Sequence, residues 1–292
     1  TSSSPSGMHY TIWKAMATSD YCAEFLCIMT SLPFMFGFAN NRWLREVDVM
    51  LEKKKGVRKI HLLRIIGLLE ADFNTALKFF IASQMQAAAE NNGISGEQWG
   101  SRKNRTSIDA AMIKLLTFEC ARVKRSTIAE VSYDKKACYD RMRIGQSNIL
   151  GRKQNVCKHL LRARAICVRK MKRHVKTAGG VSEGTYQDEI GDPIMDGEIQ
   201  GKPDNPAFYT LQSSILLEAH IELAPGLELI SCTGKRRIKH NNVSFVDDAD
   251  GHSSAEHKSE YPLMEVIHKM QKSATIWNKL VDLTGHSLAL QK

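Results

Sequence analysis

The stretch Phe245-Val246-Asp247-Asp248 places two adjacent carboxylates directly after a short apolar segment that begins at Val243. Polar residues follow, so the pattern predicts a β-hairpin whose turn carries an acidic pair. An Asp-Asp pair by itself is weak evidence for a site, because most such pairs lie in solvated turns. The interpretation therefore depends on whether other parts of the chain supply residues that belong with this pair.

Two other segments carry residues of the same kind. Asp134 follows residues 127–133, whose β-branched residues and alternation predict a strand. Between Asp134 and the acidic pair lies Gly197-Glu198-Ile199-Gln200-Gly201, a turn sequence bounded by glycines. Three carboxylates from two separate strands are what a two-metal phosphoryl-transfer site needs, because hard divalent cations prefer oxygen ligands.

The composition favours a polyanionic partner in a reducing compartment. Lysine and arginine number 41 against 31 aspartates and glutamates, which gives a net charge of +10 at pH 7. The seven cysteines show no Cys-x-x-Cys pair and no zinc-ribbon spacing, which indicates buried thiols. No secretory signal or membrane span is visible, since polar residues and Pro33 interrupt the most apolar stretch, 22–39. We therefore expect an intracellular protein, in the cytoplasm or nucleus, that is not secreted and has no membrane partner.

Residues 152–176 form the most basic segment, with ten lysines and arginines and no acidic residue. Apolar residues recur there at helical spacing, so we expect one amphipathic helix whose basic face binds phosphates. An ordinary solvated basic face is the alternative. After the acidic hairpin, the polar residues around His252 and Glu256 predict a flexible loop, because their spacing matches no metal motif.

Local signals predict several further elements. Thr106 and Asp109 form a capping-box-like helix start, and a helix is expected from Pro262 to a closing Gly285. Periodicity predicts additional helices over 20–30 and 74–90, and strand segments at 49–53 and 60–66.

These motifs, taken in chain order, resemble motifs A, B and C of reverse transcriptases. The resemblance covers Val49 to Lys292. This segment is similar to the fingers and palm of the polymerase in eukaryotic retrotransposons. Arg64-Ile65-Ile66 lies where the first fingers motif has Arg-Pro-Ile, the stretch from Trp99 to Asp109 is similar to the second, and Gly285 to Lys292 resembles motif D. Motifs that occur together in the right order are far more specific than the Asp-Asp pair alone.

The resemblance implies an α+β fold, a right-hand polymerase of fingers and palm, with an antiparallel palm sheet and helices packed on one face. The implied domains are an N-terminal arm and helical lead-in (1–48), fingers (49–125) and a palm carrying motifs A to D (126–292). The resemblance leaves room for part of the fingers between residues 141 and 190, and we expect the thumb to be absent. We expect the chain to be part of a longer polyprotein.

The resemblance also assigns roles to individual residues. Asp134 and Asp247 would ligate both of two Mg²⁺ ions, or Mn²⁺ in their place, with Asp248 as a weaker or structural ligand. Tyr139 would be the steric gate that excludes a 2′-hydroxyl on the incoming nucleotide. The remaining assignments are Arg102 and Arg105 at the triphosphate, Gln200 and Gly201 at the nascent base pair, Lys292 at the leaving pyrophosphate, and Arg162, Arg169, Lys172, Lys235 and Arg236 along the nucleic acid.

The implied activity is RNA-directed DNA synthesis, in which a dNTP is added to a primer 3′-hydroxyl on an RNA or DNA template. The chain departs from the family at Phe245, where tyrosine is usual, and at residues 202–205. There Lys202, Pro203, Asp204 and Asn205 replace small residues and a serine. Two alternatives follow: a catalytically decayed or domesticated nucleic-acid-binding module with the same fold, and an RNA-dependent RNA polymerase.

Overall fold

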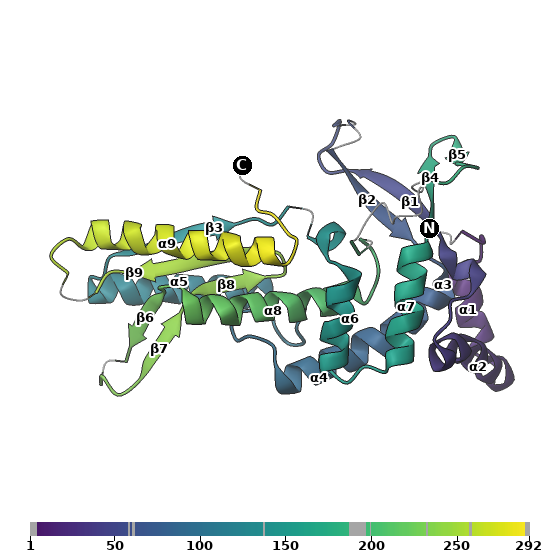
Figure 1. Ribbon diagram of the computed structural model, residues 1–292, viewed down its shortest axis with the longest axis horizontal. Coiled ribbons are helices and arrows are strands. Elements are labelled where there is room, and N and C mark those ends of the chain that lie inside the picture. Colours follow the sequence, from purple (N-terminus) through teal and green to yellow (C-terminus); the bar gives the residue numbers. More distant parts are fainter. Residues whose placement is uncertain are drawn as a thin grey trace. The chain divides into compact units, whose positions relative to one another are not determined.

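The structure is a computed structural model that describes residues 5–57, 59, 62–136, 138–186, 197–198, 200–231, 233–256 and 259–289. The chain forms two compact units, each assembled from two stretches of sequence (Figure 1). Unit 1 comprises Thr1–Ala87 and Tyr139–Phe208, and unit 2 comprises Ala88–Cys138 and Tyr209–Lys292. These bounds differ from the expected domain limits, and the assignment of fingers and palm to parts of the chain stays a prediction.

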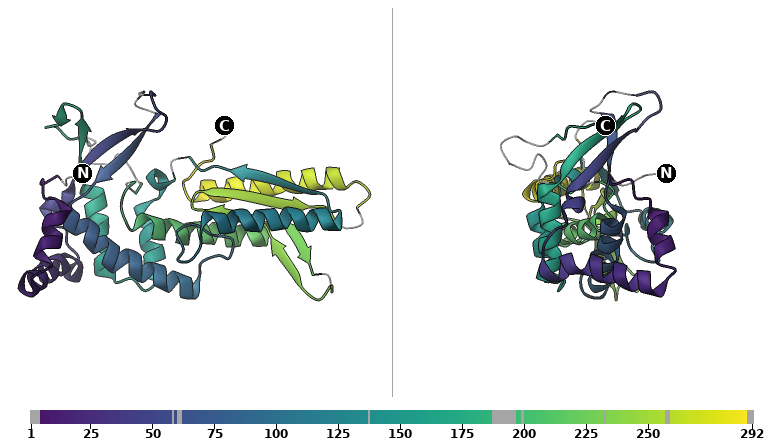
Figure 2. Two further views of the ribbon diagram at one scale, coloured as in Figure 1. Left: turned by 180° about the vertical axis from the view of Figure 1, so that it is seen from behind. Right: turned by 90° about the vertical axis from the view of Figure 1, so that its right-hand side faces the viewer.

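Unit 1 contains a four-stranded mixed sheet in the order β2-β1-β4-β5. The central strand β1 (Arg45–Glu52) pairs antiparallel with β2 (Leu63–Leu68) and parallel with β4 (Lys172–Thr177). The short β5 (Gly180–Val181) extends the sheet beside β4 (Figure 2). The other elements are α1 (Tyr10–Met16), α2 (Asp20–Phe36), η1 (Asn41–Leu44), α3 (Ala71–Ala76), the π-helix η3 (Leu77–Ala82), η4 (Tyr139–Arg141), α6 (Ile144–Lys153) and α7 (Lys158–Lys170).

Aromatic side chains form the core of unit 1. Trp43 is fully buried and stacks on Phe73 with ring centroids 4.9 Å apart, and Phe34 packs 5.5 Å from Trp43. The indole Nε1 of Trp43 donates a hydrogen bond to Asp72 Oδ2 at 2.9 Å, which satisfies a buried donor. This cluster fixes α2 and α3 against η1.

The apolar stretch at 22–39 forms most of α2, which runs past the expected end at residue 30 and continues through Pro33 to Phe36. Gly37, with φ of 70°, supplies the left-handed residue that closes the helix. In the part of the chain that the structure describes, no helix is long and apolar enough to cross a bilayer.

The basic segment 152–176 is not one helix, so that prediction was wrong. It contains the end of α6, the whole of α7 and the strand β4. Asn155, with φ of 61°, breaks the helical path between α6 and α7, a conformation that asparagine tolerates. Residues from Lys172 onward leave the helix because they complete a parallel ladder with β1, in which Lys172 pairs with Arg45.

A buried ion network fixes the turn that precedes α8 (Asn205–Leu223). Arg164 of α7 pairs with Glu198, at 2.6 Å, and with Asp204, and Lys202 pairs with Glu198 at 2.6 Å. All four side chains are fully buried, so two cations balance two anions. Burial alone would lower the pKa of Arg164, but Asp204 and Glu198 outweigh that effect and raise it. The residues at 202 and 204 that depart from the family pattern are therefore parts of a charge-balanced structural network.

Unit 2 is built on a three-stranded antiparallel sheet in the order β3-β9-β8. Its strands are β3 (Ile128–Tyr133), β8 (Asn242–Phe245) and β9 (Asp248–Ser254), and β6 (Leu227–Ile230) with β7 (Arg237–His240) forms a separate hairpin. Its helices are α5 (Ser107–Lys124), α9 (Pro262–Leu283) and most of α8, and α4 (Ser83–Asn92) enters it from unit 1.

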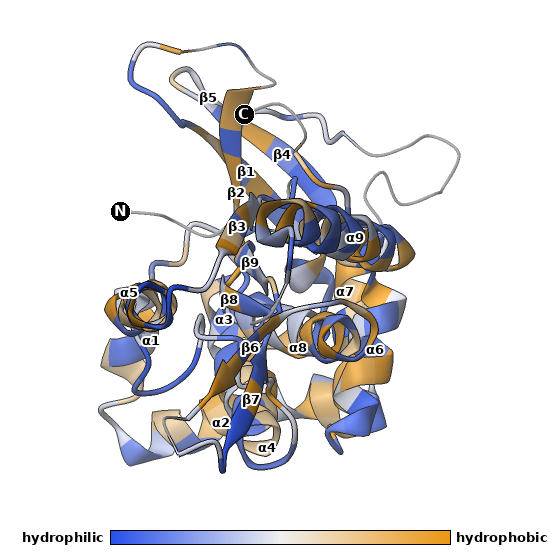
Figure 3. Ribbon diagram, turned by 90° about the vertical axis from the view of Figure 1, so that its left-hand side faces the viewer, coloured by the Kyte–Doolittle hydropathy of each residue, from blue (hydrophilic) through white to orange (hydrophobic). Residues whose placement is uncertain are grey.

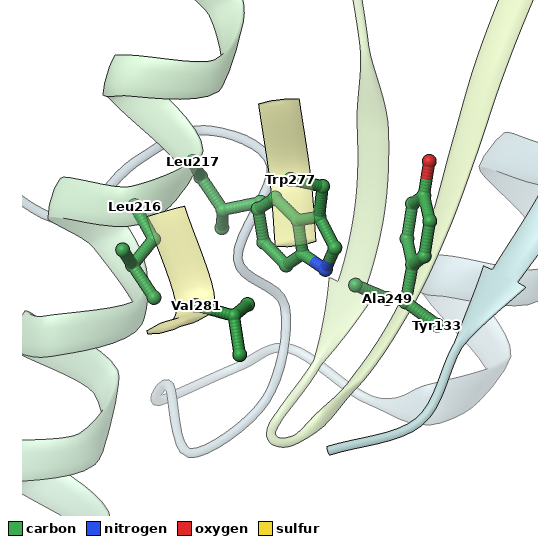
Figure 4. Close-up of a cluster of buried hydrophobic side chains, with 6 residues drawn as sticks. All are labelled: Tyr133, Leu216, Leu217, Ala249, Trp277 and Val281. Atoms are coloured by element: carbon green, nitrogen blue, oxygen red, sulfur yellow. The ribbon is translucent and has the colours of Figure 1, made fainter. Parts of the chain in front are cut away.

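Helices cover both faces of this sheet, whereas we expected them on one face. The helices α8 and α9 lie on one side and α5 on the other (Figure 3). On the α9 side, Trp277 is fully buried and contacts Tyr133, with ring centroids 5.6 Å apart (Figure 4). The cluster is completed by Leu216, Leu217, Ala249 and Val281. On the α5 side, Lys114 pairs with Glu130 at 3.0 Å and with Asp250 at 2.8 Å, and the Phe118 ring lies edge-on to His252 with centroids 6.1 Å apart.

Unit 2 contains the two helices predicted to start at Thr106 and Pro262, and the residues around His252 that were predicted to form a loop. The capping box is present, since Thr106 and Asp109 exchange reciprocal hydrogen bonds at the start of α5. The final helix begins with Pro262 at its first turn and ends before Gly285, which has φ of 80°. The loop expected around His252 was wrong, because His252 lies buried in β9, where it pairs with Glu130 of β3 and contacts its Oε2 at 2.9 Å.

The buried histidines of unit 2 make its stability depend on pH. Burial lowers the pKa of both His220 and His240 to about 4, so both stay neutral in the folded chain at neutral pH. The unfolded chain takes up these protons near pH 6.5, and it therefore binds more protons than the folded chain between pH 6.5 and 4. The free energy of unfolding should fall as the pH drops through this window, by up to about 3 kcal/mol for each histidine.

The measurement is urea unfolding at pH 7 and pH 4.5 of the wild type, His220→Gln and His268→Gln. Burial raises the pKa of Glu97 and works in the opposite direction, so the difference between variants is the informative quantity. His220→Gln should flatten the pH dependence of the free energy of unfolding relative to the wild type, and His268→Gln, at an exposed position of α9, is the control substitution. Equal pH dependence in all three chains would contradict the burial of His220.

Removal of Arg164 should destabilise the chain strongly. Arg164→Met fills a similar volume but leaves two buried carboxylates facing the single cation Lys202, which costs about 3–5 kcal/mol. Arg162→Met, at an exposed position of the same helix, should change stability by no more than about 0.5 kcal/mol. Urea denaturation of the two variants measures the free energy of unfolding. Comparable losses in the two variants would show that Arg164 is not needed to balance the buried carboxylates.

Candidate functional site

The backbone of unit 2 brings Asp134 next to the acidic hairpin. Tyr133, the last residue of β3, pairs with Ala249 of β9, and Phe245 of β8 pairs with Asp248. The β3–β9 register, continued by one residue, sets Asp134 opposite Asp248, and opposed residues of antiparallel strands lie about 4.5–5.5 Å apart at Cα. The three acidic residues therefore gather at one end of a single sheet.

Alternation along the strands decides which face carries the carboxylates. The side chains of Tyr133 and Lys135 both contact Trp277, so they point toward α9. Asp134 lies between them and points to the opposite face, because successive strand residues alternate. Ala249 belongs to the core on the α9 side, so the preceding Asp248 points to the same face as Asp134. Asp134 is half-buried and Asp248 is exposed.

Asp247 lies in a two-residue turn whose backbone is unusual. Val246 and Asp247 connect β8 to β9, and Val246 has φ of 59°. A positive φ at the first central residue, and not at the second, is the requirement of a type II′ turn, where glycine is preferred. A β-branched residue in this conformation carries strain, and such strain occurs preferentially at functional sites.

Lys135 is a buried cation on the opposite face of the strand from Asp134. Its Nζ donates to the Tyr209 hydroxyl at 2.9 Å and lies over the rings of Tyr209 and Trp277, 5.1 and 5.2 Å from their centroids. Burial lowers the pKa of Lys135 to about 8, although the nearby Cys138 and Asp247 raise it. The backbone at this position is held by a bridge to Leu288, and Ala289 N–H donates to the Asp134 carbonyl at 2.8 Å.

Arg102 and Arg105 lie in the same unit as the acidic residues and bind their own loop. The Arg102 guanidinium donates to the carbonyl oxygens of Ser95 and Gln98, both at 3.2 Å. Arg105 lies over the Trp99 ring at 4.5 Å. Both side chains are half-buried, and their contact with a triphosphate stays a prediction.

Tyr139 and the Gln200-Gly201 turn lie together in unit 1. The carbonyl of Tyr139 accepts a hydrogen bond from Glu198 N–H at 3.0 Å, and the Gln200 carbonyl accepts one from Gly67 of β2 at 3.0 Å. A Cβ at Gly197 would come within 1.7 Å of the Asp140 carbonyl oxygen, so only glycine fits there. Motif A is thus divided, with Asp134 in unit 2 and Tyr139 in unit 1.

The expected nucleic-acid-binding residues are exposed but belong to different elements. Arg162 and Arg169 lie on α7, whereas Lys172 begins β4, which corrects its placement on a helix. Lys235 and Arg236 lie in the exposed connection between β6 and β7 of unit 2. Lys292 lies outside the described residues.

The donor set suits a hard cation, because all three candidate ligands are carboxylates at one end of the sheet. Among the described residues, however, no group of three or more histidine, cysteine, aspartate or glutamate side chains is drawn together closely enough to hold a metal ion. The backbone register thus supplies the convergence of Asp134 with Asp248, while the described side chains are not gathered into a closed ligand shell.

Two features of the site were not found from the sequence. Gln98 is fully buried and contacts the turn at Val246, and Lys135 is buried next to Asp134. Both residues occur in polar, basic stretches that give no local signal of burial. Lys202 and Asp204, which the sequence marks as departures from motif B, belong to the buried ion network of unit 1, where Lys202 pairs with Glu198 and Asp204 pairs with Arg164.

Comparison with known proteins supports the fold. The chain is similar to the structure of telomerase from Candida tropicalis in complex with a TWJ fragment of telomeric RNA, with a TM-score of 0.51 and 13% sequence identity. The match covers 86% of this chain and 41% of the telomerase chain, so this chain spans less than half of that protein. No protein-family model matches the sequence, and no curated protein matches it. Telomerase is a reverse-transcriptase-related enzyme, and the fold of this chain is therefore similar to that of a reverse-transcriptase-related polymerase.

Proposed function

We propose that this chain carries the catalytic part of an RNA-directed DNA polymerase, which adds dNTPs to a primer 3′-hydroxyl on an RNA or DNA template. The observation that carries the proposal is the register of the β3-β9-β8 sheet. It sets Asp134 opposite Asp248, beside the turn that holds Asp247. Carboxylates from two strands at one sheet end are the arrangement that two-metal nucleotidyl transfer uses.

In this proposal Asp134 and Asp247 hold two Mg²⁺ ions, and Asp248 is a weaker ligand. The ions, when bound, activate the primer hydroxyl and stabilise the charge on the leaving pyrophosphate. The chain itself positions these groups. The aromatic core beneath Tyr133 fixes the strand that leads into Asp134, and Asp247 lies in the two-residue turn after β8.

Lys135 contributes a positive charge on the opposite face of the strand. Its ammonium lies over two aromatic rings and has a favourable electrostatic interaction with Asp247. The basic residues of the chain supply the complementary charge for a polyanionic template, in keeping with the net charge of +10.

A catalytically decayed nucleic-acid-binding module is the second candidate, and the departures in motif B favour it. The buried network weakens that argument, because Lys202 and Asp204 are held by Arg164 and Glu198 and so have a structural reason to differ. Measurement of nucleotide addition separates the two candidates directly.

Neutralisation of the proposed metal ligands should abolish nucleotide addition. Asp134→Asn and Asp247→Asn should each lower the rate by more than about 100-fold, since even residues behind metal ligands cost 10- to 100-fold. Asp282→Asn, at an exposed carboxylate of α9, is the matched control and should retain the wild-type rate. The assay is primer extension on RNA and DNA templates with a titration of Mg²⁺. Binding of primer–template without any Mg²⁺-dependent extension by the wild type would favour the binding module.

Replacement of Tyr139 should relax the choice of sugar. Tyr139→Val removes the ring proposed to exclude a 2′-hydroxyl, so discrimination against ribonucleotides should fall by roughly 10-fold or more. Tyr139→Phe keeps the ring and should keep the discrimination. Single-nucleotide extension with matched deoxy and ribo substrates measures both. Equal use of the two sugars by the wild type would remove this assignment and favour an RNA-dependent RNA polymerase.

A further inference from the structure

Gln98 connects three parts of unit 2 through its side-chain amide, which is fully buried. Its Oε1 accepts hydrogen bonds from the N–H groups of Gly100 at 2.9 Å and Val246 at 3.2 Å. Its Nε2 donates to Ser213 Oγ on α8 at 2.7 Å and to the Val246 carbonyl at 3.3 Å, with Ser244 Oγ at 3.4 Å. One amide thus binds both the N–H and the carbonyl group of the strained turn residue.

The segment that carries Gln98 is fixed beside β8. Trp99 N–H donates to the Ser244 carbonyl at 2.8 Å, and Ser244 N–H donates to the Glu97 carbonyl at 2.9 Å. These bonds make residues 97–99 a short parallel addition to β8. The next residue, Gly100, packs directly on the turn, since a Cβ there would lie 2.2 Å from Val246 N and 2.6 Å from Val246 Cγ2.

The conformation of Val246 requires such support. A β-branched residue with φ of 59° costs of the order of 1–3 kcal/mol, and it persists only where the surroundings determine it. Without the Gln98 amide, the buried N–H of Gly100 would lose its acceptor, at about 1–3 kcal/mol, and the partly buried N–H of Val246 would lose one as well. The turn would then be free to relax, and the following residue, Asp247, would move with it.

We propose that Gln98 is a positioning residue that clamps the Val246 turn, presents Asp247 for metal binding, and ties this turn to α8 through Ser213. The effect on catalysis rests on the proposed polymerase function, whereas the clamp itself is a statement about the turn. Gln98 touches neither substrate nor metal in this proposal, because it acts through Val246.

The test compares Gln98→Met, Gln98→Glu and Thr117→Val in the full chain. Methionine has similar length and no hydrogen bonds, whereas glutamate keeps the acceptor oxygen and loses the donors. Thr117 is the matched control, because it is a buried polar residue on α5 of the same unit. Its hydroxyl donates a hydrogen bond to the Ile113 carbonyl. The readouts are amide hydrogen exchange over residues 244–250, Mn²⁺ binding by electron paramagnetic resonance, and primer extension as a function of Mg²⁺.

For Gln98→Met we expect at least 10-fold faster exchange at Val246 and 10- to 100-fold weaker Mn²⁺ binding, the range typical of residues behind metal ligands. The Mg²⁺ concentration for half-maximal extension should rise in parallel, while KM for the dNTP stays within about twofold. Gln98→Glu should be intermediate, and Thr117→Val should match the wild type.

A second substitution distinguishes the clamp from general loss of packing. Glycine adopts a positive φ without strain, so Val246→Gly in the Gln98→Met background should recover most of the Mn²⁺ affinity. Unchanged exchange at Val246 and unchanged Mn²⁺ affinity in Gln98→Met would overturn the proposal. If the wild type adds no nucleotide, the polymerase function fails, and the exchange and Mn²⁺ measurements still decide whether Gln98 clamps the turn.

Discussion

The register between β3 and β9 is the constraint on which the candidate site depends. Tyr133 and Ala249 must lie opposite each other on the α9 face, because both pack against Trp277. Strand alternation then turns Asp134 and Asp248 to the other face, next to each other. A slip of one residue would carry Asp134 into the aromatic core and expose Tyr133, so burial of the apolar residues specifies the position of the carboxylates.

Buried charge has different roles in the two units. In unit 1, Arg164 and Lys202 balance Glu198 and Asp204, and the network holds the turn between Gly197 and α8 in one conformation. In unit 2, the cation Lys135 lies on the opposite side of its strand from Asp134 and interacts with Asp247. Residues that depart from a family motif can therefore be replacements that keep a turn rigid, and a departure alone is poor evidence for lost activity.

The turn at Val246 shows how a site can store strain and still be precise. Its backbone conformation is unfavourable for valine, and the Gln98 amide together with the close approach of Gly100 leaves it little freedom. In the proposed function, preorganisation of this kind would reduce the reorganisation that metal binding requires. The hydrogen bonds between Gln98 and Val246 join two residues that lie 148 positions apart in the sequence. They connect Gln98 to the turn that carries Asp247.

Elements whose signals are local could be predicted from the amino-acid sequence. The capping box at Thr106, the Pro262 helix, the strand before Asp134 and the acidic hairpin follow from short-range hydrogen bonds and periodicity. Tertiary structure decided the rest. The basic segment 152–176 divides because β4 completes a ladder with the distant β1, and His252 joins β9 because β3 offers a pairing partner. Burial of Arg164 and Gln98 likewise depends on partners supplied by remote segments, and no local pattern can report the free energy of contacts between residues so far apart in the chain.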